Sequence, residues 1–297
     1  MQSSKAPHMV FAALCLIWGS TWLGIKVGLD LLPPFLFAGL RFAAATVVLL
    51  FLAKFLHAKM PKNRDAWYLM SFLGIFQMTI PYGLVFWGEQ YISSGLAAVL
   101  YATLPFFVAL IAHVFINEQL TRLKVAGILV AFAGLVVIFW RDISGQSLAS
   151  RAPLFGGIAL VVSSASAAIA NVVAKKHAGQ IDPPFNVLVQ SAICSIALTA
   201  LGVVSEYGMR ADFTFVSVGA IIYLGVFGSA LGFVGLYWLL TQTSATNSSL
   251  LAFVTPILAL ILGWFVLGEV PDQSISVGTV LILAGVYLTV KPANRLA

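Results

Sequence analysis

The sequence predicts an all-α polytopic membrane protein with ten transmembrane helices in two inverted five-helix repeats. Three observations support this fold class. Hydrophobic residues make up 61% of the chain and charged residues only 9%, whereas soluble domains carry about 25% charged residues. The charges fall between long apolar runs, and one pattern of residues occurs twice along the chain.

The apolar runs are long enough to cross a bilayer as helices, because about 20 residues span the ~30 Å hydrocarbon core. We expect helices rather than barrel strands, since the runs are continuously apolar and do not alternate. In chain order the expected spans are residues 9–29, 34–56, 67–88, 93–116, 123–140, 154–175, 185–205, 215–240, 244–267 and 275–291. The connections between them are short.

The two halves of the chain share one sequence pattern. Glu118 and Glu269 each follow a proline, Pro105 or Pro256, by thirteen residues. The same offset of about 151 residues aligns further pairs: Leu73-Gly74 with Leu224-Gly225, Trp87 with Trp238, Gly127 with Gly278, and Gly134 with Gly285. This order and spacing predict a duplication, with a first repeat at 1–142, a connecting loop at 143–152 and a second repeat at 153–297.

The distribution of Lys and Arg predicts the orientation. With the N-terminus in the cytoplasm, eleven of these residues lie on the cytoplasmic side and three on the other, in agreement with the positive-inside rule. Because five spans is an odd number, the second half enters the membrane in the opposite direction from the first. Inverted repeats of this kind recur in secondary transporters, where they open a midplane site to either side.

The charge and cysteine content limit the expected partners. The net charge of +6 arises from loop residues facing an anionic leaflet, so nucleic acid is not an expected partner. Cys15 and Cys194 lie inside expected spans, which indicates neither a disulfide framework nor a metal site. The first apolar run lacks a cleavage site and should remain as a helix. We expect a monomer in the bacterial inner membrane, with both termini cytoplasmic.

Sequence features of catalysis are missing. All ten Asp and Glu residues lie in expected loops or at helix ends, and phosphate loops, nucleophile elbows and paired metal-ligand histidines do not occur. We therefore predict no catalytic residue, no metal, no cofactor and no buried carboxylate. His113, near the end of the fourth span, is either a helix-packing residue or a proton relay.

Several segments resemble a known family. They are WGSTW in the first span, RF in the second, GLAAVLYATLPFFVALIAHVFINEQLTRLKVAGILVAFAGLVVI, and TNSSLLAFVTPILALILGWFVLGEVPDQSISVGTVLILAGVYL in the second half. Over nearly the whole chain the sequence resembles the EamA repeat of the drug/metabolite transporter superfamily, and within it the YddG-type bacterial exporters of aromatic amino acids. The resemblance implies ten helices around a central cavity lined mainly by spans one, three, four, six, eight and nine.

Aromatic and neutral polar residues in these spans are candidate substrate contacts. Amides and hydroxyls suit the ammonium and carboxylate of a zwitterion, and aromatic rings suit its side chain. Alternatively, such polar residues join helices to each other. The candidates are Trp18, Trp22, Gln77, Tyr82, Tyr101, Asn171, Tyr237, Ser248 and Phe253.

Other residues have expected roles in movement or structure. Pro105 and Pro256 remove a helix hydrogen bond at matching depths, so they are either hinges or static kinks. Glu118 and Glu269 end the same spans, where each has a structural helix-end role or acts as a gating contact. 

Lys26 and Arg41 are cations within expected spans. A charge at a helix centre costs about 2.5 to 3.5 kcal/mol on insertion scales, so each should reach the interface, bond to carbonyls or face water. We expect Lys26 to snorkel. For Arg41 the first interpretation is a structural anchor, and the second is attraction of a substrate carboxylate.

The sequence therefore predicts export of amino acids, with aromatic ones favoured, and of related small metabolites by alternating access. The expected partners are this small-molecule substrate and the lipid bilayer. A multidrug or organic-cation exporter of the same fold should use a buried acid, and a sugar or nucleotide-sugar carrier more cavity cations. A membrane-embedded enzyme would need a nucleophile, an acid pair or a metal. Without a buried carboxylate we expect downhill or exchange transport, rather than proton coupling through His113 or a helix-end Glu.

Overall fold

A computed structural model describes residues 6–116, 120–145, 151–177, 179–242 and 251–290, and every secondary-structure element within them is a helix. Most expected spans are single helices: α1 (Ala6–Leu29), α2 (Pro34–Phe55), α7 (Arg122–Gly145), α8 (Ala152–Lys176), α9 (Pro183–Ser205), α13 (Leu251–Leu267) and α14 (Gln273–Val290). The third and eighth spans contain a π-helical segment: α3 (Arg64–Leu73), η1 (Gly74–Thr79) and α4 (Ile80–Glu89), then α10 (Phe215–Tyr223), η3 (Leu224–Leu231) and α11 (Gly232–Gln242). The fourth is divided into α5 (Ser94–Tyr101) and α6 (Leu104–Ile116).

The length and apolar character of these helices confirm a multi-pass membrane protein. Within the described residues, seven helical stretches are long and apolar enough to cross a bilayer: Ala6–Leu29, Pro34–Phe55, Arg64–Glu89, Ser94–Phe115, Ala152–Lys176, Pro183–Ser205 and Phe215–Leu239. Large apolar side chains point away from the bundle, for example Phe51 at 72% exposure and Phe265 at 73%. Apolar surface of this kind requires a lipid environment.

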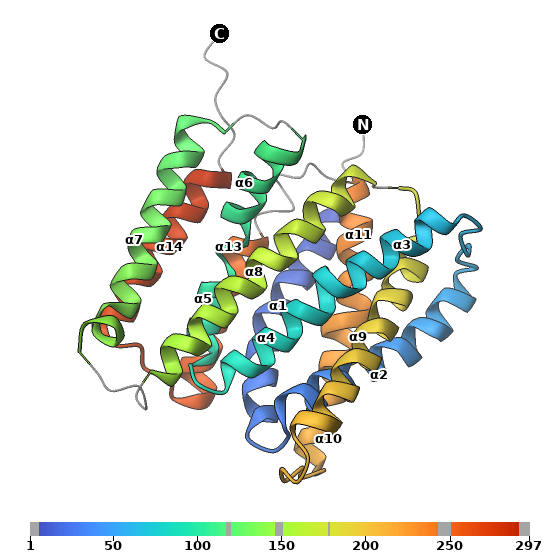
Figure 1. Cartoon of the computed structure of the whole chain (residues 1–297), viewed down its shortest axis with the longest axis horizontal. Coiled ribbons are helices and arrows are strands. Elements are labelled where there is room, and N and C mark those ends of the chain that lie inside the picture. Colours follow the sequence, from blue (N-terminus) through green and yellow to red (C-terminus); the bar gives the residue numbers. More distant parts are fainter. Residues whose placement is uncertain (1–5, 117–119, 146–150, 178, 243–250, 291–297) are drawn as a thin grey trace.

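The helices pack in a small number of close pairs. The helix α2 lies along α9, and α7 lies along α14 at one edge of the bundle (Figure 1). The first helix, α1, packs against α10, α11 and α13, while α8 packs against η1, α4 and α6. The helices α5 and α13 also contact each other.

Glycines bring α7 and α14 into backbone contact. A Cβ added to Gly127 would lie 2.6 Å from the carbonyl oxygen of Gly285, and one added to Gly134 would lie 2.7 Å from that of Gly278. Conversely, a Cβ added to Gly285 would lie 2.5 Å from the carbonyl oxygen of Gly127, and one added to Gly278 would lie 2.7 Å from that of Gly134. Small residues allow helix backbones to approach in this way in membranes.

The two π-helical segments begin at the Leu-Gly pairs that the repeat pattern aligns, Leu73-Gly74 and Leu224-Gly225. A π-helical turn leaves carbonyls without regular partners, and hydroxyls from α8 bind two of them near η1. Ser166 Oγ donates to the Phe76 carbonyl at 3.0 Å, and Ser163 Oγ donates to the Pro81 carbonyl at 2.9 Å. The serines of α8 therefore join helices at this level.

The two matched prolines lie in different local structures. Pro105 is the second residue of α6, just after the break that ends α5, whereas Pro256 lies inside the continuous helix α13. The fourth span, expected at 93–116 with a kink at Pro105, is therefore interrupted just before this proline. A break before Pro105 is physically reasonable, because proline cannot donate the backbone hydrogen bond that would continue the helix.

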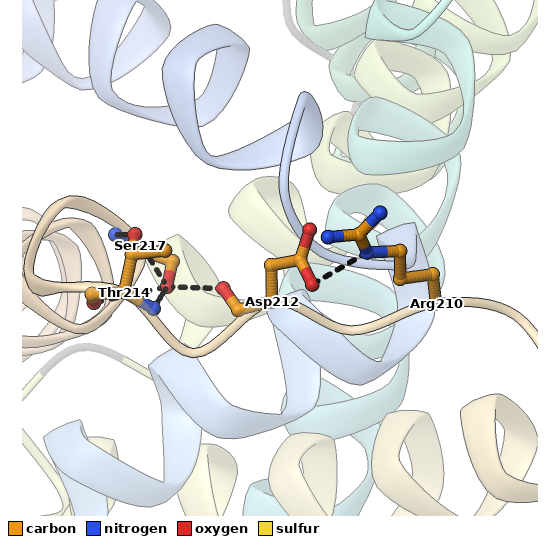
Figure 2. A network of polar contacts seen from close by, with 4 residues as sticks. All are labelled: Arg210, Asp212, Thr214 and Ser217. Atoms are coloured by element: carbon orange, nitrogen blue, oxygen red, sulfur yellow. Dashed lines mark hydrogen bonds and ion pairs between the residues drawn. The ribbon is translucent and has the colours of Figure 1, made fainter.

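Polar contacts fix the connection between α9 and α10 (Figure 2). Arg210 Nε donates to Asp212 Oδ1 at 2.7 Å, and Thr214 and Ser217 form a capping box at the start of α10. Ser217 Oγ donates to the Asp212 carbonyl at 2.7 Å, and the Asp212 N–H donates to the Leu31 carbonyl at 2.9 Å. The connection is thereby held against the turn between α1 and α2.

Candidate functional site

An aromatic group lies where α1, α4 and α11 meet. Trp18 Nε1 donates to the Gly228 carbonyl in η3 at 3.0 Å, and the Trp18 ring lies 5.7 Å from that of Phe233. The Phe233 ring lies 6.3 Å from the ring of Tyr82, which lies 4.9 Å from that of Phe42. Two predicted residues, Trp18 and Tyr82, thus share a site with Phe233, which the sequence analysis did not single out.

Arg41 places a positive charge beside two of these rings, those of Tyr82 and Phe42. Its side chain is only 1% exposed, and its Cζ lies 4.6 Å from the centroid of the Tyr82 ring, within range of a cation–π interaction. Its Nε donates to Ser229 Oγ in η3 at 2.9 Å. The Nη1 nitrogen is buried without a hydrogen-bond partner.

A second aromatic pair continues along the same face of α1. The Trp22 and Tyr101 rings lie 5.6 Å apart, and both pack against the core cluster that also contacts Tyr82. Since Trp18 and Trp22 are one helical turn apart, the two aromatic groups extend along α1.

Buried amides form a further polar group. Gln190 Nε2 in α9 donates to Asn186 Oδ1 at 2.8 Å and to the Tyr237 hydroxyl at 3.3 Å. The Oε1 atoms of Gln190 and of Gln77, in η1, are both buried without partners. Gln190 and Asn186 were missed, although two amides four residues apart in an apolar span are a signal for a shared helix face.

The remaining substrate candidates are placed only in part. Asn171 is half-buried in α8. Phe253 lies in α13, and Ser248 lies outside the described residues, as does Glu118. Of the predicted residues, the structure therefore brings together Trp18 with Tyr82, and Trp22 with Tyr101, while Tyr237 joins the amides of α9.

Lys26 bonds to backbone carbonyls and does not snorkel. Its Nζ donates to the carbonyls of Glu89 at 2.9 Å and Ile92 at 2.8 Å. Glu89 is the last residue of α4 and Ile92 lies just beyond it, and a cation is favourable at this end because the helix dipole is negative there. Lys26 therefore fastens α1 to the turn between α4 and α5.

Glu89 corrects the expectation that no carboxylate is buried. It lies at a helix end as predicted, but its side chain is 0% exposed and both carboxyl oxygens lack hydrogen-bond partners. Helix ends within a bundle can be covered by neighbouring helices, here α1, α2, α5 and α8. Position along the chain alone did not indicate this burial.

Two carboxylates bind the first turns of other helices. Glu269 Oε1 accepts from the Ser94 N–H at 2.8 Å, and Oε2 accepts from the Ser94 hydroxyl at 2.8 Å and the Gly95 N–H at 3.2 Å. Glu206 likewise accepts from the N–H groups of Phe35 and Leu36, at 2.8 and 3.0 Å. Both compensate unpaired N–H groups at a helix start.

An all-helical membrane bundle with a buried cation among aromatic rings has the features of a membrane transport protein. The chain belongs to the EamA-like transporter family, whose model matches residues 6–140 and 154–291. The resemblance to the EamA repeat is thereby confirmed. The chain is a transporter of the drug/metabolite type and not an enzyme.

Relatives and a solved structure agree with this assignment. The uncharacterized transporter YoaV of Bacillus subtilis is 31% identical over 95% of this chain and 96% of its own. An uncharacterized transporter of Archaeoglobus fulgidus is 30% identical over 95% and 98%, and protein PagO of Salmonella typhimurium is 27% identical over 96% and 93%. A protein crystal structure matches the fold with a TM-score of 0.66 and 19% identity, over 96% of this chain and 98% of its own.

Proposed function

We propose that this transporter exports amino acids, preferentially aromatic ones, across the bacterial inner membrane by alternating access. The single observation that carries the proposal is the buried guanidinium of Arg41, whose Nη1 is unpartnered and whose Cζ lies beside the rings of Tyr82, Phe42 and Phe86. An arginine fork binds carboxylates through charge-assisted hydrogen bonds, and the adjoining rings provide an apolar surface for an aromatic side chain.

The amides supply the complementary groups. The unpartnered Oε1 atoms of Gln77 and Gln190 are acceptors, which suit the ammonium of an amino acid. Hydrogen-bond donors for a substrate carboxylate and acceptors for a substrate ammonium occur in one bundle. This combination favours a zwitterion over a simple cation. Related small metabolites that carry a carboxylate and a ring fit the same groups.

The transport cycle is proposed to use two inverted five-helix repeats, ten helices in all, around a central cavity. The helix pairing supports this, because exchanging the halves converts the contacts of α1 with α10, η3, α11 and α13 into those of α8 with α3, η1, α4, α5 and α6. The glycine contacts behave in the same way: the repeat alignment converts Gly127 with Gly285 into Gly278 with Gly134. In this proposal both termini are cytoplasmic, and Pro105 and Pro256 are the hinges.

Counterflow in proteoliposomes tests the proposal. Vesicles loaded with unlabelled Phe or Trp should accumulate labelled Phe, whereas vesicles loaded with Ala or Glu should accumulate less. Tryptamine, which retains the ring and amine of Trp but lacks the carboxylate, should compete weakly. Equal counterflow with all four amino acids would reject the aromatic preference, and its absence with every amino acid would reject the substrate class.

An organic-cation exporter is the second candidate, because Glu89 is the kind of buried acid that such a protein needs. Against it, the cations Lys26 and Arg41 both interact electrostatically with Glu89, so the surroundings are not net negative. Inhibition of Phe counterflow by tetraphenylphosphonium, with little inhibition by Trp, would favour this candidate over the amino acid exporter.

A further inference from the structure

The carboxyl group of Glu89 has no evident structural role. It is 0% exposed, and neither oxygen has a hydrogen-bond partner. Burying an ionised carboxylate without partners is so unfavourable that the group binds a proton instead. A buried carboxyl group without partners is therefore suited to hold a proton.

The charged side chains around Glu89 make hydrogen bonds to groups other than its carboxyl. From α1, Lys26 Nζ donates to the carbonyls of Glu89 and Ile92. From α2, Arg41 Nε donates to Ser229. The carboxylate of Glu269, which follows α13, accepts from Ser94 and Gly95. All three of these charged side chains interact electrostatically with the Glu89 carboxyl.

The other elements that pack against α4 add little charge. In the described residues, η1 and α5 contain no Asp, Glu, Lys or Arg. For α8, the charged residues are Arg151, just before its start, and Lys175 and Lys176 at its far end. Among the described residues, the charges nearest the Glu89 carboxyl are therefore the two cations Lys26 and Arg41 and the anion Glu269.

A cavity lies at the turn that follows Glu89. It has a volume of about 280 Å³, and its lining includes Tyr91, Ile92, Ser93 and Glu269. Three of these residues follow Glu89 within four positions, in the turn that Lys26 binds. Opening of this end would break the contacts that Lys26 and Glu269 make with this turn and expose the carboxyl group to water.

We propose that Glu89 is a proton-binding site that couples transport to the proton gradient, as a proton/substrate antiporter. This proposal rests on the proposed alternating-access cycle. Glu89 takes a proton from the outer compartment as the α4–α5 end closes. The proton leaves when the inner side opens and water reaches the carboxyl group through the central cavity of the proposed cycle. One proton thus moves inward as substrate moves outward.

The test compares Glu89→Gln with the wild type in proteoliposomes. Wild-type protein should take up labelled Phe faster when the vesicle lumen is more acidic than the medium. The variant should lose this stimulation while keeping counterflow at equal pH, because exchange does not require a change of protonation. Glu206→Gln is a matched control, since it removes another buried helix-end carboxylate, and it should keep the stimulation.

The outcomes separate this inference from the proposed function. Absence of wild-type counterflow with any amino acid would count against the proposed substrate, without involving Glu89. Counterflow without stimulation by the gradient in the wild type, or undiminished stimulation in Glu89→Gln, would overturn the proton site. A pH-sensitive dye in the lumen provides a second readout: added Phe should make the lumen more alkaline with the wild type and not with the variant.

Discussion

Glu269 accepts two hydrogen bonds from Ser94, one from its backbone N–H and one from its hydroxyl, each at 2.8 Å. The two residues come from opposite halves of the chain, and the contact holds the start of α5 against the end of α13. A carboxylate at this position compensates N–H groups that the helix leaves unpaired and is favoured by the positive end of its dipole.

Replacing Glu269 by Ala should therefore destabilise the protein by about 1 to 3 kcal/mol, because buried donors lose their acceptor. Thermal unfolding in detergent measures this loss of stability. The stability of Glu269→Gln should lie between those of the wild type and Glu269→Ala. Asp272, which accepts from the Ile275 N–H at an exposed helix start, provides a control: Asp272→Ala should cost less. Equal losses at the two positions would contradict the buried-cap interpretation.

Replacing Arg41 should weaken binding of carboxylate substrates. Arg41→Gln loses the charge, and Arg41→Lys keeps it without the planar fork, so the half-saturation concentration should rise in both, more in Gln. Hydrogen bonds to charged groups contribute about 1.5 to 3 kcal/mol, which corresponds to a rise of about tenfold to a hundredfold. Concentration-dependent counterflow measures the effect, with Ser229→Ala as the variant that removes only the Nε partner. A similar rise for tryptamine would show a structural effect instead.

Replacing the amide of Gln77 by Ala should raise the half-saturation concentration, because an acceptor for the substrate ammonium is lost. Asn171→Ala tests the same role in α8. Folding must be verified by size-exclusion chromatography, since buried amides also join helices. Unchanged transport kinetics in folded protein would assign both residues to helix packing.

The glycines between α7 and α14 should tolerate little added volume. Gly134→Ala places a Cβ 2.7 Å from the Gly278 carbonyl oxygen, so the helices must separate, and a loss of about 1 to 3 kcal/mol is typical of overpacking. Gly219→Ala in α10 is the control, because an added Cβ there has no neighbour within 4 Å. Thermal unfolding compares them, and equal stability would contradict close contact of α7 with α14.

Much of the helical framework was predictable, because apolar length is a strong signal for a membrane helix. The glycines that join α7 to α14 were also visible as repeat matches. The burial of Glu89 was not predictable, because it depends on four neighbouring helices rather than on position in α4. Phe233 and Gln190 were overlooked for a related reason: aromatic and amide residues occur in many spans, and only packing shows which ones meet Tyr82 or Tyr237.

The π-helical segments also determine which side chains face each other. One extra residue in a turn rotates everything after it by about 100°, since a regular helix has 3.6 residues per turn. Tyr82 follows η1 and Phe233 follows η3, and their rings meet at 6.3 Å. Deleting a single residue from either segment would turn the π-helical segment into a regular helix, and would rotate one of these rings away from the other toward a different neighbour.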